Sequence, residues 1–176
     1  MLKGWLLRRR LLKRLPPPEA VRTVLVMCTA NRVRSPFAEA MLRRELPSRV
    51  TVLSRGILEG GGRCPGEAVE AARHFDVDLS AHRARQVTAG DLLHADLVLT
   101  MELRMAHDLA VKYPALVHKV AVLTIFQRQW GGVRDIDDPY MLPPAEYEYA
   151  YDTIAACCSA LAARYAPPSP PRHGQE

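Results

Sequence analysis

The chain has 176 residues, of which 48% are hydrophobic, enough for one globular domain with its own core. Its formal net charge is +5, but six of the 24 basic residues precede the first acidic residue, Glu19, which leaves 18 basic and 19 acidic residues beyond Leu15. Proteins that bind nucleic acids usually carry basic charge spread over a folded face. The nearly neutral charge of residues beyond Leu15 therefore argues against nucleic-acid binding.

The cysteines and the apolar runs are signals of the cellular compartment in which the protein works. Neither the number nor the spacing of the cysteines is typical of a disulfide framework or a zinc site, so we expect free thiols, no metal and a cytoplasmic location. No apolar run approaches the roughly 20 residues that a transmembrane helix needs. The cysteines are Cys28, Cys64, Cys157 and Cys158.

Residues 1–18 form a basic leader that we expect to be helical or frayed. Its apolar side chains alternate with arginine and lysine, which permits weak contact of residues 1–15 with a membrane surface; an extension without function is the alternative. Three consecutive prolines, Pro16 to Pro18, separate the leader from the rest because they cannot continue a helix. The apolar residues considered for membrane contact are Leu2, Trp5, Leu6, Leu12 and Leu15.

The remaining chain alternates between strands, predicted from apolar runs, and helices, predicted from apolar residues at helical spacing. Such alternation is typical of a parallel α/β sheet covered by helices on both faces. We therefore expect one domain over residues 19–166 and a disordered tail at 167–176. In chain order, the predicted elements are a strand at 22–27, a helix at 36–46, a strand at 49–53, helices at 67–75 and 88–94, a strand at 96–100, a helix at 102–112, a strand at 119–123, a loop rich in Gly, Asp and Pro at 131–144, and a long helix at 145–165.

The eight residues from Cys28 to Ser35, between the first strand and the first helix, contain a cysteine and an arginine separated by five residues. The spacing alone is weak, because Cys158 and Arg164 repeat it inside the last predicted helix, where backbone N–H groups are already bonded. The position of the first pair, between a strand and a helix, is more specific evidence for a phosphate site than the spacing. Ligands of parallel α/β sheets bind beyond the carboxyl ends of the strands, and a loop that opens a helix presents N–H groups to an anion. Arg34 would add a planar fork for two phosphate oxygens.

Cys28 is a candidate nucleophile. A helix N-terminus and a nearby arginine stabilise a thiolate over a thiol, which would allow in-line attack on phosphorus. A buried structural cysteine is the alternative, since cysteine is often buried for packing alone.

A cysteine nucleophile also needs a general acid for the departing oxygen. The loop before the last helix offers Asp135, Asp137 and Asp138. Pro139 restricts Asp138 to extended backbone conformations, which favours a side chain directed into a cleft. An ordinary acidic turn is the alternative for any one of these residues.

Together these motifs resemble the low molecular weight protein tyrosine phosphatases over about residues 23–165. That family carries Cys-x5-Arg-Ser-Pro near its start and Asp-Pro-Tyr near its end, and here these motifs stand at residues 28–36 and 138–140. Their order and wide separation make the pair more specific than either half. Segments 54–56 and 78–85 also agree with the family pattern.

The resemblance implies a three-layer domain with a four-stranded parallel sheet, and hydrolysis of protein phosphotyrosine through a phosphocysteine intermediate without a metal or other cofactor. Cys28 would be the nucleophile, Arg34 would bind phosphate and stabilise the transition state, and Asp138 would protonate the leaving group and later activate water. Ser35 would hydrogen-bond the sulfur, and Tyr140 would form an aromatic wall for the substrate ring.

The remaining loop residues would bind phosphate and keep the loop in shape, with Asn31 holding its strained backbone and Ser54 and His82 supporting Asn31. Ala30 stands where the family usually has glycine, so the loop either tolerates a Cβ there or is strained. Val33 stands where many relatives have a second cysteine, so a disulfide that shields the nucleophile from over-oxidation cannot form. The loop residues expected at the phosphate are Thr29, Ala30, Asn31, Arg32 and Val33.

Two further departures from the family pattern lie at the rim of the expected pocket. Arg32 replaces a usually apolar residue, and Met141 replaces a common second aromatic residue. Arg32 would favour acidic residues around the phosphate of the substrate.

Three other functions stay open. A noncatalytic phosphoprotein-binding module would fit the altered rim, although the joint presence of Cys28, Arg34, Ser35 and Asp138 argues against it. Arsenate reduction needs further cysteines near the third strand, and residues 97–112 have none. Protein arginine phosphatase activity would be favoured by threonine where this chain has Arg32. The sequence indicates no particular oligomeric state.

Overall fold

The computed structural model describes residues 2–128 and 133–165, with the backbone alone for residues 2–7. Its centre is a parallel four-stranded sheet in the order β2-β1-β3-β4, which confirms the predicted fold class. The tail predicted at 167–176 and the first residues of the loop predicted at 131–144 lie outside the described residues. The strands are β1 (Thr23–Cys28), β2 (Thr51–Gly56), β3 (Leu97–Thr100) and β4 (Val120–Val122).

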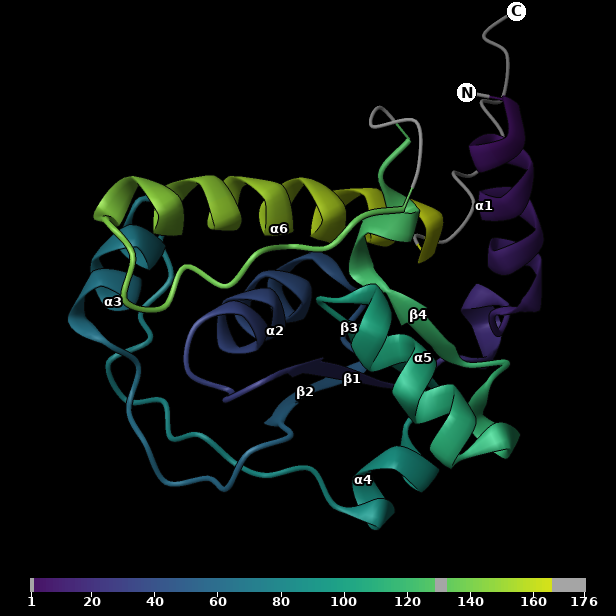
Figure 1. Cartoon of the computed structure of the whole chain (residues 1–176), viewed down its shortest axis with the longest axis horizontal. Helices are drawn as coiled ribbons and strands as arrows, with labels where there is room; N and C mark the ends of the chain where they lie inside the picture. Colours follow the sequence, from purple (N-terminus) through teal and green to yellow (C-terminus); the bar gives the residue numbers. More distant parts are fainter. Residues whose placement is uncertain (1, 129–132, 166–176) are drawn as a thin grey trace, which may run out of the picture.

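Helices cover both faces of the sheet (Figure 1). The helices are α1 (Leu2–Arg14), α2 (Arg34–Glu45), α3 (Gly66–Arg73), α4 (Ala89–His94), α5 (Leu103–Lys112) and α6 (Pro144–Tyr165), with short 3-10 segments η1 (Pro18–Ala20), η2 (Pro114–Leu116) and η3 (Leu123–Phe126). On one face α2 packs on β1 and is itself covered by α6, which also contacts α3. On the other face lie α4 and α5.

The side chains of β1 alternate between the two cores. Val24 and Val26 belong to the core beneath α2 and α6, whereas Leu25 and Met27 belong to the core beneath α4 and α5. Because successive side chains of a strand point to opposite faces, a strand covered on both sides shows an uninterrupted apolar run. That run is the feature from which this strand was predicted.

Two boundaries at the carboxyl edge of the sheet differ from the predictions. β2 continues to Gly56 because its register with β1 pairs Gly56 with Cys28. α2 begins at Arg34, two residues before Pro36. Pro36 therefore occupies the first turn, where the missing N–H removes no helical hydrogen bond.

α1 docks on the body of the domain. Leu12 packs against the core, and Leu15 is buried. Arg8 donates from Nε and Nη2 to the carbonyl oxygens of Ile125 and Phe126, at 2.7 and 3.0 Å. The leader is thus helical, and Leu12 and Leu15, which were considered for membrane contact, pack on the protein instead. None of the described helices combines the length and the apolar character needed to cross a membrane.

Candidate active site

Cys28 is the last residue of β1 and lies at the carboxyl edge of the sheet, where residues 29–33 turn into α2. Its side chain is buried, its Sγ lies 3.0 Å from Ser35 Oγ, and the Asn31 N–H donates to Sγ at 3.3 Å. Hydrogen-bond donors directed at a sulfur favour negative charge on it.

The backbone of residues 29–33 forms a cradle of N–H donors at the start of α2. Within the described chain, the N–H groups of Ala30, Arg32 and Val33 donate to no protein acceptor. Together with the N-terminal end of α2, these groups suit an anion with several oxygens, such as phosphate.

Asn31 holds the cradle in shape. Its φ of 53° lies in the left-handed region, which asparagine tolerates better than most residues. Its Nδ2 donates to Ser35 Oγ at 2.9 Å and to Ser54 Oγ at 2.8 Å, and its Oδ1 accepts from the Arg85 N–H at 2.9 Å. Its carbonyl oxygen accepts from His82 Nε2 at 2.9 Å. Asn31 therefore joins the loop to α2, to β2 and to segment 82–85.

The hydroxyl groups around Asn31 form a directional chain. Ser54 donates to the Glu39 carboxylate, so its oxygen is the acceptor for Asn31. Ser35 Oγ also accepts from Asn31, which leaves its own hydrogen to point at Cys28 Sγ. The carboxylate of Glu39 thus orients a series of hydrogen bonds that ends in a donor to the sulfur.

The backbone conformation at residue 30 and the close approach of residue 56 to the cradle explain which amino acids these two positions tolerate. Ala30, where the family usually has glycine, is outside the left-handed region, so its Cβ is tolerated. Glycine is required instead at position 56, since a Cβ there would lie 2.8 Å from the carbonyl carbon of Ala30 and 2.9 Å from the nitrogen of Asn31. This close approach lets the Ile57 N–H donate to the Thr29 carbonyl at 2.8 Å.

The guanidinium of Arg34 is buried at the mouth of the cradle, with 1% of the residue exposed. Its Nη1 donates to Glu102 Oε1 and to the Ile136 carbonyl, both at 2.8 Å. Its Nη2 donates to Asp138 Oδ2 at 2.7 Å and to Thr29 Oγ1 at 3.4 Å. Its Nε is buried and has no hydrogen-bond partner among the described residues. A buried N–H without an acceptor is costly, and a bound phosphate oxygen would supply one.

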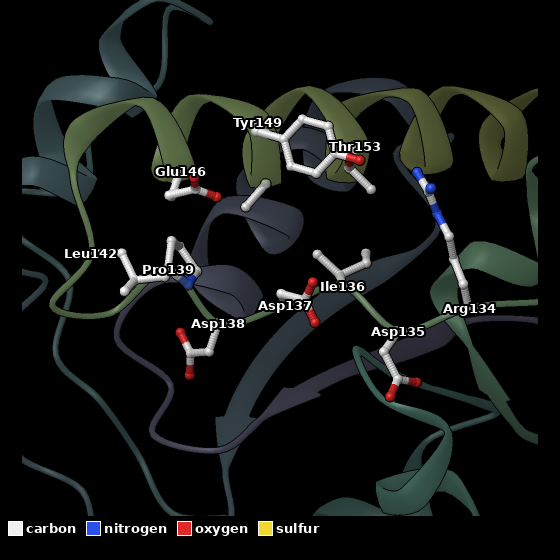
Figure 2. A pocket seen from close by; sticks show the side chains of 11 residues that line it. Arg134, Asp135, Ile136, Asp137, Asp138, Pro139, Leu142, Glu146, Tyr149 and Thr153 are labelled. Carbon is white, nitrogen blue, oxygen red and sulfur yellow. The ribbon is translucent and has the colours of Figure 1, made fainter.

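The three aspartates of the loop before α6 lie in different surroundings. Asp138 contacts Arg34, whereas Asp135 accepts the Leu103 N–H at 2.6 Å at the start of α5. Asp137, like Asp135 and Asp138, lines a cavity of about 330 Å³ between this loop and α6, and neither Cys28 nor Arg34 is among the lining residues. Figure 2 shows the Asp138 carboxylate turned away from α6.

The rim of the site carries an aromatic ring and a cation. Tyr140 is 44% exposed, and the guanidinium carbon of Arg32 lies 5.4 Å from the centre of its ring. Arg32 Nε also donates to the Arg63 carbonyl at 2.8 Å, which fixes it over the ring. Met141, the next residue in the chain, is 83% exposed.

Residues 23–167 match the family model of low molecular weight phosphotyrosine protein phosphatases. The chain belongs to the low molecular weight protein tyrosine phosphatase family. It is 38% identical over 133 residues to the low molecular weight protein-tyrosine-phosphatase Wzb of Salmonella typhi, and this match covers 74% of the chain and 85% of the relative.

Similar proteins of known structure include one in complex with a phosphonate and one named as an arginine phosphatase. Wzb of Vibrio vulnificus, in complex with benzylphosphonate, is 30% identical with a TM-score of 0.73 and covers 82% of this chain and 99% of its own. The YwlE arginine phosphatase of Geobacillus stearothermophilus is 28% identical with a TM-score of 0.73, covering 81% of this chain and 91% of its own.

Two phosphatase residues at the site were not predicted from the sequence. Glu102 follows β3 almost directly, and a carboxylate just beyond the carboxyl end of a central strand is a signal that could have indicated it. Tyr151 of α6 donates to the Val33 carbonyl at 3.2 Å, and its ring stacks on Phe37 with centroids 3.9 Å apart. Burial raises the pKa of Tyr151 far above its usual range, so its hydroxyl stays a donor. No local sequence pattern indicates this contact.

The other cysteines of the phosphatase lie in surroundings that disfavour a thiolate. Burial raises the pKa of Cys64 to about 11, despite the opposing effect of Arg32, and raises the pKa of Cys157 to about 12. Burial also raises the pKa of Cys158 well above its usual value. All four cysteines are unbridged, and the described residues contain no cluster of His, Cys, Asp and Glu that could hold a metal ion.

The close approach at Gly56 predicts that Gly56→Ala distorts the cradle. We expect a loss of about 1–3 kcal/mol in the free energy of unfolding, because a Cβ overlaps backbone that cannot move independently. Phosphate affinity should fall as well. Gly66→Ala is the matched control, since a Cβ there meets no atom within 4 Å. Urea denaturation and phosphate titration of both variants check this, and equal behaviour of the two would contradict it.

The surroundings of the thiols predict that iodoacetate at neutral pH labels Cys28 first. Cys64, with its pKa raised to about 11, is almost wholly protonated at that pH and reacts slowly. Phosphate should protect Cys28 and leave the slow labelling of Cys64 unchanged. Peptide mapping by mass spectrometry measures both rates, and faster labelling of Cys64 than of Cys28 would refute the expectation.

Proposed function

We propose that this chain is a protein tyrosine phosphatase that hydrolyses phosphotyrosine on protein substrates through a phosphocysteine intermediate. The observation that carries the proposal is the buried Arg34, whose Nε has no partner among the described residues, beside Cys28 at a cradle of N–H donors. Family membership and the named activity of Wzb relatives support the same reaction. The cradle acts as a P-loop that takes the phosphate of the substrate.

In the first step, Cys28 Sγ attacks phosphorus and forms the S–P bond while the bond from phosphorus to the tyrosine oxygen breaks. Asp138 gives its proton to the departing phenolate oxygen. In the second step, Asp138 takes a proton from water, the hydroxide oxygen bonds to phosphorus, and the S–P bond breaks. Ser35 donates to the leaving thiolate, so the direction of its hydrogen bond suits this step.

Arg34 Nη2 and Asp138 Oδ2 form an ion pair at 2.7 Å. A phosphate that accepts from Nε and Nη2 of Arg34 would compete with Asp138 for the guanidinium. The phosphate and the carboxylates of Asp138 and Glu102 would then share one guanidinium, and a proton on Asp138 would reduce their repulsion. Glu102, on Nη1, would keep the guanidinium in place throughout.

The rim supports an aromatic substrate. Tyr140 is exposed beside the cradle and offers a ring face to a phosphotyrosine ring. The Vibrio vulnificus relative holds benzylphosphonate, which joins an aromatic ring to a phosphorus oxyanion. Arg32 lies against Tyr140 and adds positive charge that would favour acidic residues around the phosphotyrosine.

We also propose a reducing, cytoplasmic location, supported by the four unbridged cysteines. Contact of residues 1–15 with a membrane would be electrostatic, since Leu12 and Leu15 pack on the protein while Lys13 and Arg14 are exposed.

A phosphopeptide panel tests the function. Wild type should release phosphate from phosphotyrosine peptides and from para-nitrophenyl phosphate, with little release from the matching serine, threonine and arginine peptides. Cys28→Ser should abolish turnover, because an oxygen replaces the ionisable sulfur. A wild type that binds phosphopeptides without turnover would establish the noncatalytic module, and preferred turnover of phosphoarginine would establish the arginine phosphatase.

The position of Asp138 predicts a leaving-group effect. Asp138→Asn should lower kcat for a phosphotyrosine peptide by about 10²–10⁴-fold, since the phenolate must leave without a proton. The loss should be smaller for para-nitrophenyl phosphate, whose leaving group needs protonation less. Asp137→Asn is the matched control and should stay near wild type. Equal losses for both substrates would argue against a general acid at Asp138.

The charge of Arg32 predicts a peptide preference. Arg32→Ile should lower the preference for acidic over neutral peptides by up to about fivefold in kcat/KM, as expected for a partly exposed charge pair. Arg104→Gln, which removes an exposed arginine on α5, controls for net charge. An unchanged peptide preference in Arg32→Ile would refute the assignment.

A further inference from the structure

A cationic cavity lies away from the catalytic cradle, between α1 and the C-terminal part of α6. Its volume is about 420 Å³, and its lining contains three arginines: Arg8, Arg128 and Arg164. Leu12, Phe126 and two alanines of α6 form its apolar floor. Figure 1 shows α1 beside this end of α6, and Arg164 Nη2 donates to the Leu12 carbonyl at 3.2 Å.

The positive charge of this cavity is not neutralised by its own lining. No acidic side chain is among the lining residues that the structure describes. Arg8 and Arg164 donate to backbone carbonyls, which accept hydrogen bonds but carry no net charge. Burial and then the charges of Arg128 and Arg164 lower the pKa of Arg8. Three like charges around one hollow destabilise it unless an anion joins them.

The cavity depends on a part of the chain that the family match does not include. Arg8 and Leu12 belong to α1, whereas the family model begins at residue 23. No lining residue belongs to the cradle, to the supports of Asn31 or to residues 133–143, which carry Asp138. A ligand here would therefore act separately from the chemistry at Cys28.

We propose that Arg8, Arg128 and Arg164 form a second phosphate-binding site that takes a phosphate attached to an apolar group. Guanidinium groups bind phosphate oxygens in a planar, bidentate manner, and the floor of Leu12 and Phe126 accepts the apolar part. The phosphate of an anionic phospholipid has this chemistry, and free phosphate shares its charged part. Lys13 and Arg14 are exposed on the same helix and add to its positive charge, although Arg14 lines a different cavity.

Vesicle binding tests whether an anionic phospholipid is the ligand of the cavity. Three proteins are compared: the wild-type chain, the cavity variant Arg128→Gln/Arg164→Gln and the control variant Arg49→Gln/Arg104→Gln. Each is sedimented with vesicles of phosphatidylcholine alone or of equal parts phosphatidylcholine and phosphatidylglycerol. We expect binding to the anionic vesicles alone. Loss of two arginines from the cavity should weaken it about 30-fold, at about 1 kcal/mol for each arginine near the surface. The control removes the same net charge outside the cavity and should stay near wild type.

Equilibrium dialysis with inorganic phosphate tests whether free phosphate is the ligand of the cavity. Wild type and the control should bind two phosphates per chain, and the cavity variant one. The cavity variant should turn over para-nitrophenyl phosphate like wild type, which shows that it is folded. The single variant Arg128→Gln, whose side chain makes no hydrogen bond in the described structure, guards against misfolding of the double variant.

Loss of vesicle binding in the cavity variant alone supports the site with lipid as its ligand. Loss of the second phosphate, with no vesicle binding by wild type, supports it with free phosphate as its ligand. One phosphate per wild-type chain, together with equal vesicle binding by the cavity and control variants, overturns the proposal.

Discussion

The site depends on one buried guanidinium. Arg34 lies at the first position of α2, and its nitrogens are held by Glu102 beyond β3, by the Ile136 carbonyl and by Asp138 in the loop before α6. Three segments distant in sequence therefore meet at one side chain. Burying a charge is costly unless it is paired, so these contacts fix Arg34 firmly while its Nε stays without a protein partner. The geometry suits a phosphate that completes the hydrogen bonding.

Around that charge, the hydrogen bonds of Asn31 shape the cradle. Asn31 adopts a left-handed conformation at the cost of some strain, and its amide and carbonyl groups are bonded to α2, to β2 and to segment 82–85. The absence of a side chain at Gly56 brings β2 against the loop. Because these supports come from rigid elements, the donors at Cys28 are in place before substrate arrives, which reduces the reorganisation needed during reaction.

Much of this arrangement could be predicted from the sequence, because its signals are local. The apolar run of β1, the cysteine at its end and the spacing to Arg34 place the cradle at the carboxyl edge of a parallel sheet. The contacts that could not be predicted join segments far apart. The bond from Tyr151 to Val33 depends on how α6 crosses α2, and the docking of α1 depends on where η3 ends. Composition alone suggested a membrane face for Leu12, whereas tertiary packing determined its place.

A crystal structure of the wild-type chain with vanadate would show whether Arg34 and the cradle bind the reacting group at Cys28. Vanadate forms a five-coordinate complex that resembles the phosphorus transition state. We expect a bond from vanadium to Cys28 Sγ, hydrogen bonds from Arg34 Nε and the N–H groups of residues 29–33 to the equatorial oxygens, and Asp138 beside the apical oxygen. Vanadate bound elsewhere, or bound at Cys28 with Arg34 Nε still lacking an acceptor, would contradict it.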